Sequence, residues 1–118
     1  MSRNRIAVVA GVLVLFVIVG GILIYASRSG GKPVTLNVTV IGGKTMNPPD
    51  LAAHQNDTVT VNVTSDTDGE VHLHGYDLIF NAKKGQTVSK TFKADKSGSY
   101  PIEWESTSTE LGQLVVSP

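Results

Sequence analysis

The chain has 118 residues, ten basic and ten acidic side chains, and no cysteine. This length is enough for about one domain, and the lack of cysteine excludes disulfides, thiolate metal ligands and cysteine nucleophiles. The charge is uneven: residues 1–32 carry four bases and no acid, whereas residues 33–118 carry six lysines and ten acids, a formal charge of −4. Phosphate binding needs a basic surface, so this acidic segment disfavours nucleic acid as a partner.

Residues 6–26 form an apolar run of 21 residues without a charge. A helix of this length crosses about 30 Å of hydrocarbon, and the run exceeds the roughly 7–15 apolar residues of a cleaved secretory signal. Arg3 and Arg5 precede the run and should stay in the cytoplasm. We therefore expect a cytoplasmic tail (1–5), a transmembrane signal anchor (6–26), a linker (27–32) and a domain (33–118) outside the cytoplasm. This organisation describes a single-pass protein of the cell membrane.

From residue 33 onward, apolar and polar residues alternate with a period of two, as in strands that have one buried face. The alternating runs are 34–40, 58–64, 71–74, 76–80, 86–92, 100–104 and 111–116. Gly42-Gly43 and Asn47-Pro48-Pro49-Asp50 predict a long loop between the first two runs. No window of residues 33–118 predicts a helix of ordinary length. Six or seven short strands at this spacing predict an all-β sandwich.

The run Glu70-Val71-His72-Leu73-His74-Gly75 contains the most specific local feature. In a strand, His72 and His74 project from the same face, with their Cα atoms about 6–7 Å apart. Two imidazoles at this spacing can chelate one copper, zinc or nickel ion, and Gly75 directly afterwards would allow a kink or the close approach of another strand. In the alternative interpretation, Val71 and Leu73 are a core pair and the histidines simply face water.

Three later segments carry a resemblance to a known family. They are Lys-Lys-Gly-Gln-Thr-Val-Ser-Lys-Thr-Phe (83–92), Ala-Asp-Lys-Ser-Gly-Ser-Tyr-Pro-Ile-Glu-Trp (94–104) and Leu-Gly-Gln-Leu-Val-Val (111–116). Together with the order of the strands, they resemble the cupredoxin-like domains over about residues 33–118. The resemblance implies a Greek-key β-sandwich of cupredoxin type.

The resemblance also implies where a copper site would lie. Copper-binding members use a first His, a Cys, a second His and usually a Met. His72 falls at the first His, but Trp104 stands at the Cys position, residues 105–108 contain no His, and Glu110 stands at the Met position. Without the thiolate, we do not expect a blue-copper electron carrier.

A different metal site remains open. His72 and His74, with Glu105 or Glu110, would form a histidine and carboxylate set for Cu(II) or Zn(II), and we take His72, His74 and Glu105 as the predicted ligands. Met46 and His54, in the expected long loop, are weaker candidates. The alternatives to metal binding are a metal-free interaction or structural domain with a cell-envelope partner, and a surface whose paired histidines respond to pH. No nucleophile elbow or phosphate loop is present, so we expect no enzyme.

Overall fold

The alternating segments form nine strands and one short helical turn in the computed structural model, which describes residues 31–118. The predicted cytoplasmic tail and signal anchor lie outside the described residues. No helix in the described part of the chain is long and apolar enough to cross a membrane. The elements are β2 (Pro33–Ile41), β3 (Thr45–Asn47), β4 (Asp50–His54), β5 (Thr58–Ser65), β6 (Gly69–Leu73), β7 (Leu78–Ala82), β8 (Thr87–Lys93), β9 (Gly98–Trp104), η1 (Glu105–Thr107) and β10 (Thr109–Ser117).

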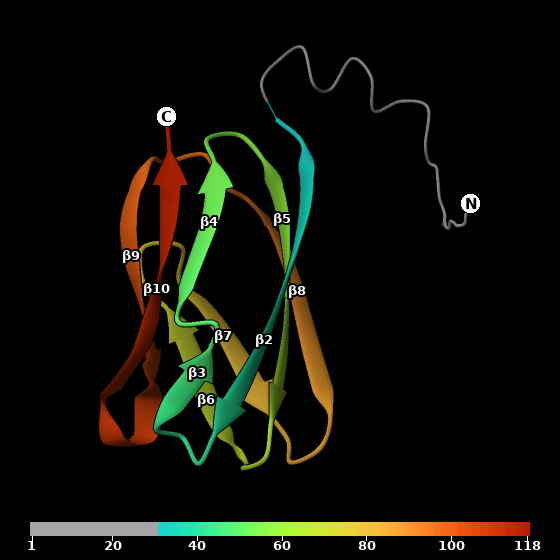
Figure 1. The fold of residues 1–118 in the computed structure, drawn as a ribbon, viewed down its shortest axis with the longest axis vertical. Helices are drawn as coiled ribbons and strands as arrows, with labels where there is room; N and C mark the ends of the chain where they lie inside the picture. Colours follow the sequence, from blue (N-terminus) through green and yellow to red (C-terminus); the bar gives the residue numbers. More distant parts are fainter. Residues whose placement is uncertain (1–30) are drawn as a thin grey trace, which may run out of the picture. The chain divides into compact units, whose positions relative to one another are not determined.

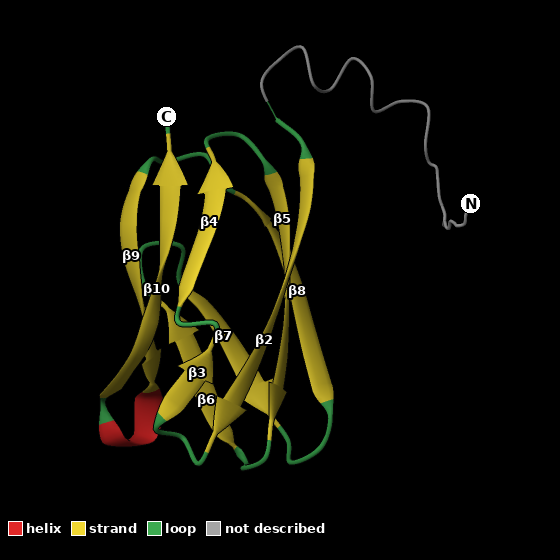
Figure 2. Ribbon diagram, viewed as in Figure 1, coloured by secondary structure: helices red, strands yellow, loops and turns green. Residues whose placement is uncertain are grey.

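The strands form two sheets that face each other (Figure 1). One sheet has five strands in the order β4-β10-β9-β6-β7, and the other has four in the order β3-β2-β5-β8. The pairs β2–β5 and β4–β10 are parallel, and the remaining pairs are antiparallel. Figure 2 shows that strands dominate residues 31–118 and that η1 is a single helical turn between β9 and β10. The predicted all-β sandwich is confirmed.

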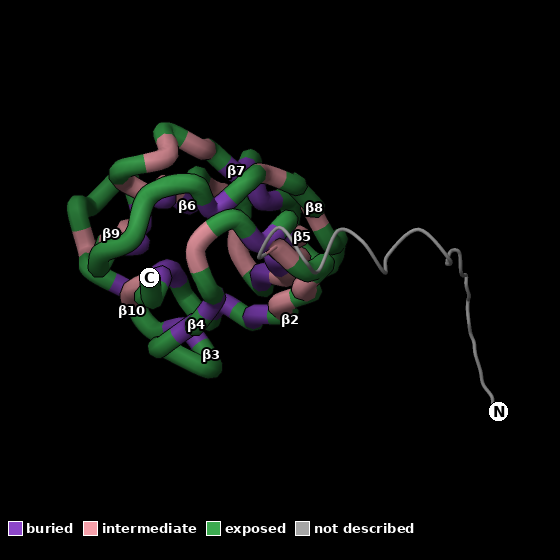
Figure 3. The backbone as a smooth tube through the Cα atoms, turned by 90° about the horizontal axis from the view of Figure 1, so that it is seen from above, coloured by how far each residue is buried: buried purple, intermediate pink, exposed green. Residues whose placement is uncertain are grey.

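The core lies between the sheets and is built from the apolar half of each alternating run. In β5, Val59, Val61 and Val63 are buried while the intervening residues face outward. Seen from above, the strands surround one interior, and the buried positions follow it (Figure 3). Phe80, Leu114 and Val40 are among the largest fully buried side chains. Since residues of β2 to β10 supply this core, the sandwich has its own hydrophobic interior.

One local expectation was wrong, and another was correct in one of its two alternatives. The stretch predicted as a long loop contains β3 and β4, which pair with β2 and β10 and so belong to different sheets. β3 has only three residues, and β4 contains Ala52 and Ala53 on opposite faces, so neither shows a clear alternation of apolar and polar residues. Gly75, expected at a kink or a close approach of another strand, lies in a reverse turn with φ +87° between the antiparallel strands β6 and β7, and a Cβ there would clash with the Tyr100 ring of β9. There its lack of a side chain permits the left-handed backbone.

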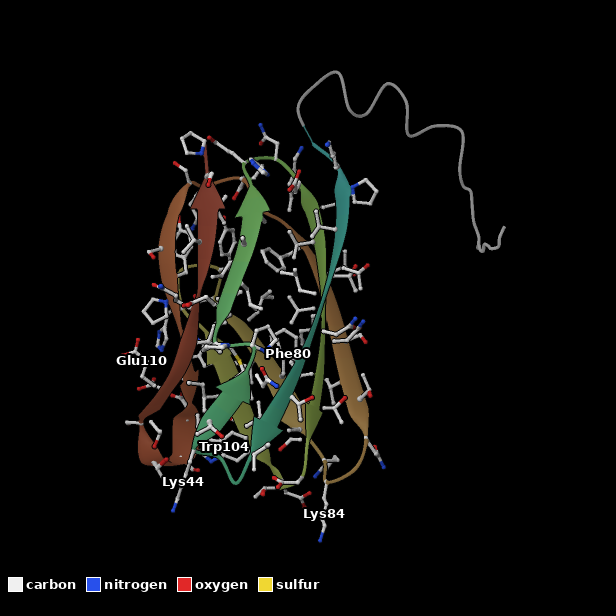
Figure 4. All side chains as sticks on the ribbon, in the orientation of Figure 1. Lys44, Phe80, Lys84, Trp104 and Glu110 are labelled. Atoms are coloured by element: carbon white, nitrogen blue, oxygen red, sulfur yellow. The ribbon has the colours of Figure 1, made fainter. Side chains whose placement is uncertain are left out.

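Trp104 fills one end of the sandwich, next to η1. Its indole is 4% exposed and lies inside the lower end of the molecule in Figure 4. Two glycines make room for the ring: a Cβ on Gly69 would lie 2.1 Å from Trp104 Cζ2, and one on Gly43 would lie 2.6 Å from Trp104 Cε2. The buried indole fixes the end of β9, and therefore the residues on both sides of Trp104.

Candidate metal centre

The alternation of β6 places His72, in the strand, and His74, directly after it, on the outer face of the five-stranded sheet. Val71 and Leu73 are 1% and 2% exposed and belong to the core. The side chains of His72 and His74, one residue out of phase, are 16% and 40% exposed. The two interpretations of this segment are therefore not exclusive, because a core pair and a histidine pair occupy opposite faces of one strand.

Two glutamates on either side of Trp104 contact the histidines. Glu103, on β9, is directly opposite His72 in the register, and its Oε1 lies 2.9 Å from His74 Nε2. Glu105, the first residue of η1, places Oε1 3.1 Å from His72 Nδ1. Glu105 is about half-exposed, whereas the Glu103 side chain is 26% exposed. Each imidazole therefore has its own carboxylate partner.

The three predicted ligands lie together. The imidazole rings of His72 and His74 have centroids 4.0 Å apart and an interplanar angle of 37°. One ligand atom each from His72, His74 and Glu105 can be chosen so that all lie within 4.8 Å of one another. Glu110, the alternative carboxylate, is opposite Glu103 on β10 and lines a surface pocket with His74 and Pro101. Figure 4 shows Glu110 at the outer edge of the molecule.

His72 Nε2 is a buried nitrogen without a hydrogen-bond partner in the structure. The carboxylate of Asp77 is close to it, with Oδ1 at 3.6 Å, which is an ion-pair distance and too long for a hydrogen bond. A buried polar atom without a partner costs about 1–3 kcal/mol. His72 Nε2 therefore carries a lone pair or an N–H for which the protein provides no hydrogen-bond partner.

Hydrogen bonds to Lys96 hold the turn that follows the histidines. The Tyr76 hydroxyl donates to the Lys96 carbonyl oxygen at 2.7 Å, and Lys96 Nζ donates to the Gly75 carbonyl oxygen at 2.6 Å. Burial of the Tyr76 ring raises the pKa of its hydroxyl, although the hydrogen bond from the Lys96 backbone opposes this shift. Asp77 follows with φ +54°, a left-handed conformation that Asp adopts more readily than most residues.

The weaker candidates lie elsewhere. Met46 is in β3, where its side chain is 5% exposed and belongs to the core. His54 ends β4 opposite Ser117, at the end of the sandwich where β9 begins with Gly98. Five residues of β9 separate Gly98 from Glu103, about 17 Å of strand. Neither side chain joins the histidine pair.

The acidic turn between β5 and β6 has a structural role. Asp66 Oδ1 accepts a hydrogen bond from the Gly42 N–H at 2.8 Å, and Asp68 Oδ1 accepts one from the Lys84 N–H at 2.8 Å. The Gly42 hydrogen bond lowers the pKa of Asp66, and a hydrogen bond from Thr67 lowers it further. These two carboxylates connect neighbouring loops and are separate from the histidine cluster.

Sequence reasoning missed Glu103 and Asp77 as members of the cluster. Glu103 lies two residues before Glu105, so a signal for it was present in the same alternation that placed the histidines. Asp77 required knowledge that the chain reverses at Gly75, which returns it to the side of His72.

Several solved structures have a similar sandwich. The domain superposes on a copper-binding protein in the apo form with a TM-score of 0.60 at 12% identity, covering 70% of this chain and 85% of that one. A chain of a heme-copper terminal oxidase dimer gives 0.61 at 20% identity, with 75% and 67% covered. Auracyanin A, a blue copper protein of the photosynthetic bacterium Chloroflexus aurantiacus, gives 0.54 at 19% identity, with 71% and 98% covered. The domain has the cupredoxin-like fold. No family model matches the sequence, and neither does any curated protein.

This cupredoxin-like domain does not contain a blue-copper ligand set. The position that the resemblance gives to the Cys ligand holds Trp104, whose indole is buried between the sheets. The position given to the Met ligand holds the exposed Glu110, and the chain has no cysteine at all. The residues present therefore do not fit a blue-copper centre, whereas the histidine and carboxylate cluster on the outer face has the donor chemistry for Cu(II) or Zn(II).

Proposed function

We propose that this protein is a membrane-anchored, cupredoxin-like metal-binding protein whose domain lies outside the cytoplasm. It holds one Cu(II) or Zn(II) through His72, His74 and a neighbouring carboxylate, and it is a binding protein rather than an enzyme. One observation carries the proposal: ligand atoms of His72, His74 and Glu105 lie within 4.8 Å of one another.

The separations are compatible with a metal site after small side-chain movements. Zinc ligands lie about 2.0–2.1 Å from the ion, so two ligands of a tetrahedral site are about 3.3 Å apart. The longest separation of 4.8 Å must therefore shorten by roughly 1.5 Å. Glu105 is about half-exposed and can supply part of this movement without disturbing the core.

The donor atoms favour divalent ions over Cu(I). Imidazole and carboxylate groups suit Cu(II) and Zn(II), whereas Cu(I) prefers thiolate and thioether ligands. The chain has no cysteine, and Met46 is buried in the core. At a site of nitrogen and oxygen donors, Cu(II) binds more tightly than Zn(II). We therefore expect Cu(II) to bind more tightly than Zn(II). Because the chain has no thiolate, the copper complex should lack an intense blue colour.

Membrane attachment rests on the sequence. Residues 6–26 are apolar and long enough for one helical span, and Arg3 and Arg5 precede them. The order of these segments favours a short cytoplasmic tail and an external domain. A cell-envelope protein that delivers or receives the metal is the partner we expect for such a protein.

Calorimetric titration of the full-length chain, purified without a His tag in a mild detergent at pH 7.5, tests the metal proposal. We expect one Cu(II) per chain, loss of binding in His72→Ala, and normal binding in His54→Ala. The last variant is the matched control, because His54 is exposed and lies at the other end of the sandwich. Equal loss in both variants, or no heat with either metal, would contradict the proposal.

A metal-free interaction domain is the second candidate, and one observation favours it. Each histidine already has a carboxylate partner, at 3.1 Å for His72 and 2.9 Å for His74. These pairs satisfy one nitrogen of each ring without any ion. Absence of binding for both Cu(II) and Zn(II) in the titration would favour this candidate.

A further inference from the structure

The hydrogen bonds of the cluster determine which imidazole nitrogens are free. An ionised carboxylate only accepts hydrogen bonds, so the nitrogen facing it must carry the proton. Glu105 therefore accepts a hydrogen bond from His72 Nδ1–H, and Glu103 accepts one from His74 Nε2–H. A neutral imidazole has a single N–H. The lone pairs left for a ligand are those of His72 Nε2 and His74 Nδ1.

His72 Nε2 is the atom that the fold leaves unsatisfied. It is buried without a hydrogen-bond partner, and Asp77 Oδ1 lies 3.6 Å away. Two ligands of one tetrahedral ion are about 3.3 Å apart, so an ion fits between these atoms with a shift of a few tenths of an ångström. The contact between His72 Nδ1 and Glu105, by contrast, is already complete as a hydrogen bond at 3.1 Å.

We propose, on the basis of the metal-binding function above, that Asp77 is the carboxylate ligand and that the ion binds His72 through Nε2. His74 supplies the second imidazole through Nδ1, because its Nε2 is held by Glu103. Glu105 and Glu103 are positioning residues that fix the tautomer and orientation of the two rings, as carboxylates commonly do behind metal-bound histidines. This assignment differs from the ligand set His72, His74 and Glu105.

The turn that carries Asp77 suits this role. Tyr76, immediately before it, is hydrogen-bonded in both directions to the Lys96 backbone, at 2.7 and 3.1 Å. The Asp77 side chain itself is 95% exposed, so it can move toward the ion without breaking a packed contact. The structure thus combines a fixed backbone with a free carboxylate beside an unsatisfied nitrogen.

Long-range ¹H–¹⁵N NMR of the full-length chain in detergent, before and after addition of Zn(II), tests the assignment. Without metal, we expect His72 in the Nδ1–H form and His74 in the Nε2–H form. With Zn(II), the largest nitrogen shifts should occur at His72 Nε2 and His74 Nδ1. Bound zinc with the main shift at His72 Nδ1, or His72 in the Nε2–H form without metal, would overturn the inference and leave the proposed function intact.

Three carboxylate variants give an independent measurement by Cu(II) and Zn(II) titration. Asp77→Asn should lower affinity by about tenfold or more, whereas Glu105→Gln should change it by less than about threefold, because the Gln oxygen still accepts the hydrogen bond from His72 Nδ1–H. Glu70→Gln, which removes the same charge from an exposed site two residues before His72, is the matched control and should have no effect. A larger loss in Glu105→Gln than in Asp77→Asn would overturn the assignment. Failure of the unmodified chain to bind either ion would overturn the proposed function, and this assignment with it.

Discussion

Replacing Gly69 with alanine places a methyl group in the space that the Trp104 indole occupies. The new Cβ would lie 2.1 Å from Trp104 Cζ2 and 2.5 Å from Cη2, whereas carbon atoms in contact are normally about 3.5–4.0 Å apart. The ring is 4% exposed and cannot withdraw into solvent without opening the core. Overpacking of this kind costs about 1–3 kcal/mol. For a domain of this size, each kcal/mol lowers the melting temperature by about 4–8 °C.

Gly42→Ala is the matched control, because it introduces a methyl group without a clash. Gly42 has φ +62° and no atom within 4 Å of an added Cβ, so its cost is backbone strain alone, about 1–2 kcal/mol. Gly43→Ala combines both effects, since Gly43 has φ +64° and its Cβ would lie 2.6 Å from Trp104 Cε2. We therefore expect Gly43→Ala to be the most destabilising of the three.

Urea unfolding of the full-length chain in detergent, followed by tryptophan fluorescence, measures these differences, because Trp104 is the single tryptophan. A double-mutant cycle with Trp104→Phe, followed by circular dichroism, isolates the clash. Phe is smaller, so Gly69→Ala should cost less in the Trp104→Phe background, with a coupling energy of at least about 1 kcal/mol. The reasoning is refuted if the coupling energy is zero, or if Gly69→Ala leaves the urea midpoint unchanged.

Three further predictions concern attachment and pH. Protease added to intact cells should remove residues 33–118 and leave the amino-terminal tail protected; an intact domain that becomes cleavable only after lysis would reverse the orientation. The domain should lose stability as the pH falls below about 4, because the pKa of Asp66 is lower in the folded protein than in the unfolded chain, which therefore takes up the proton first. Asp66→Asn should flatten that part of a thermal-stability profile. Stability should also fall as the pH rises above about 10, because the pKa of Tyr76 is raised in the folded protein and its hydroxyl therefore loses the proton more readily in the unfolded chain. A stability profile of Tyr76→Phe that is equally steep in this range would contradict the prediction.

The strands that could be predicted are those in which apolar and polar residues alternate clearly. Val59, Val61 and Val63 alternate over the whole of β5, and each is buried as expected. β3 was missed because three residues show no period, and β4 because its adjacent Ala52 and Ala53 give no contrast between its two faces; what defines β4 is pairing with β10, far along the chain. A local pattern cannot show such long-range pairing.

The candidate site was predictable to a similar extent. The histidine pair followed from the spacing of two residues, because strand geometry alone puts such residues on one face. Glu105 was a candidate from the resemblance, but its contact with His72 depends on η1, which begins at that residue. The tautomers, the unsatisfied Nε2 and the approach of Asp77 all depend on three segments meeting at one place. They are properties of tertiary structure, and the sequence contains no local sign of them.

The parallel pairing of β2 with β5 has a consequence for the position of the histidine cluster. Pro33 is level with Thr58, at the same end of the sandwich as the carboxyl terminus, while η1 with Glu105 lies at the opposite end (Figures 1 and 2). Counting along β9, five residue steps, or about 17 Å of strand, separate Gly98, at the carboxyl-terminal end of the sandwich, from Glu103, opposite His72. If the domain is held by its first strand, His72 therefore lies in the half of the sandwich farther from the point of attachment.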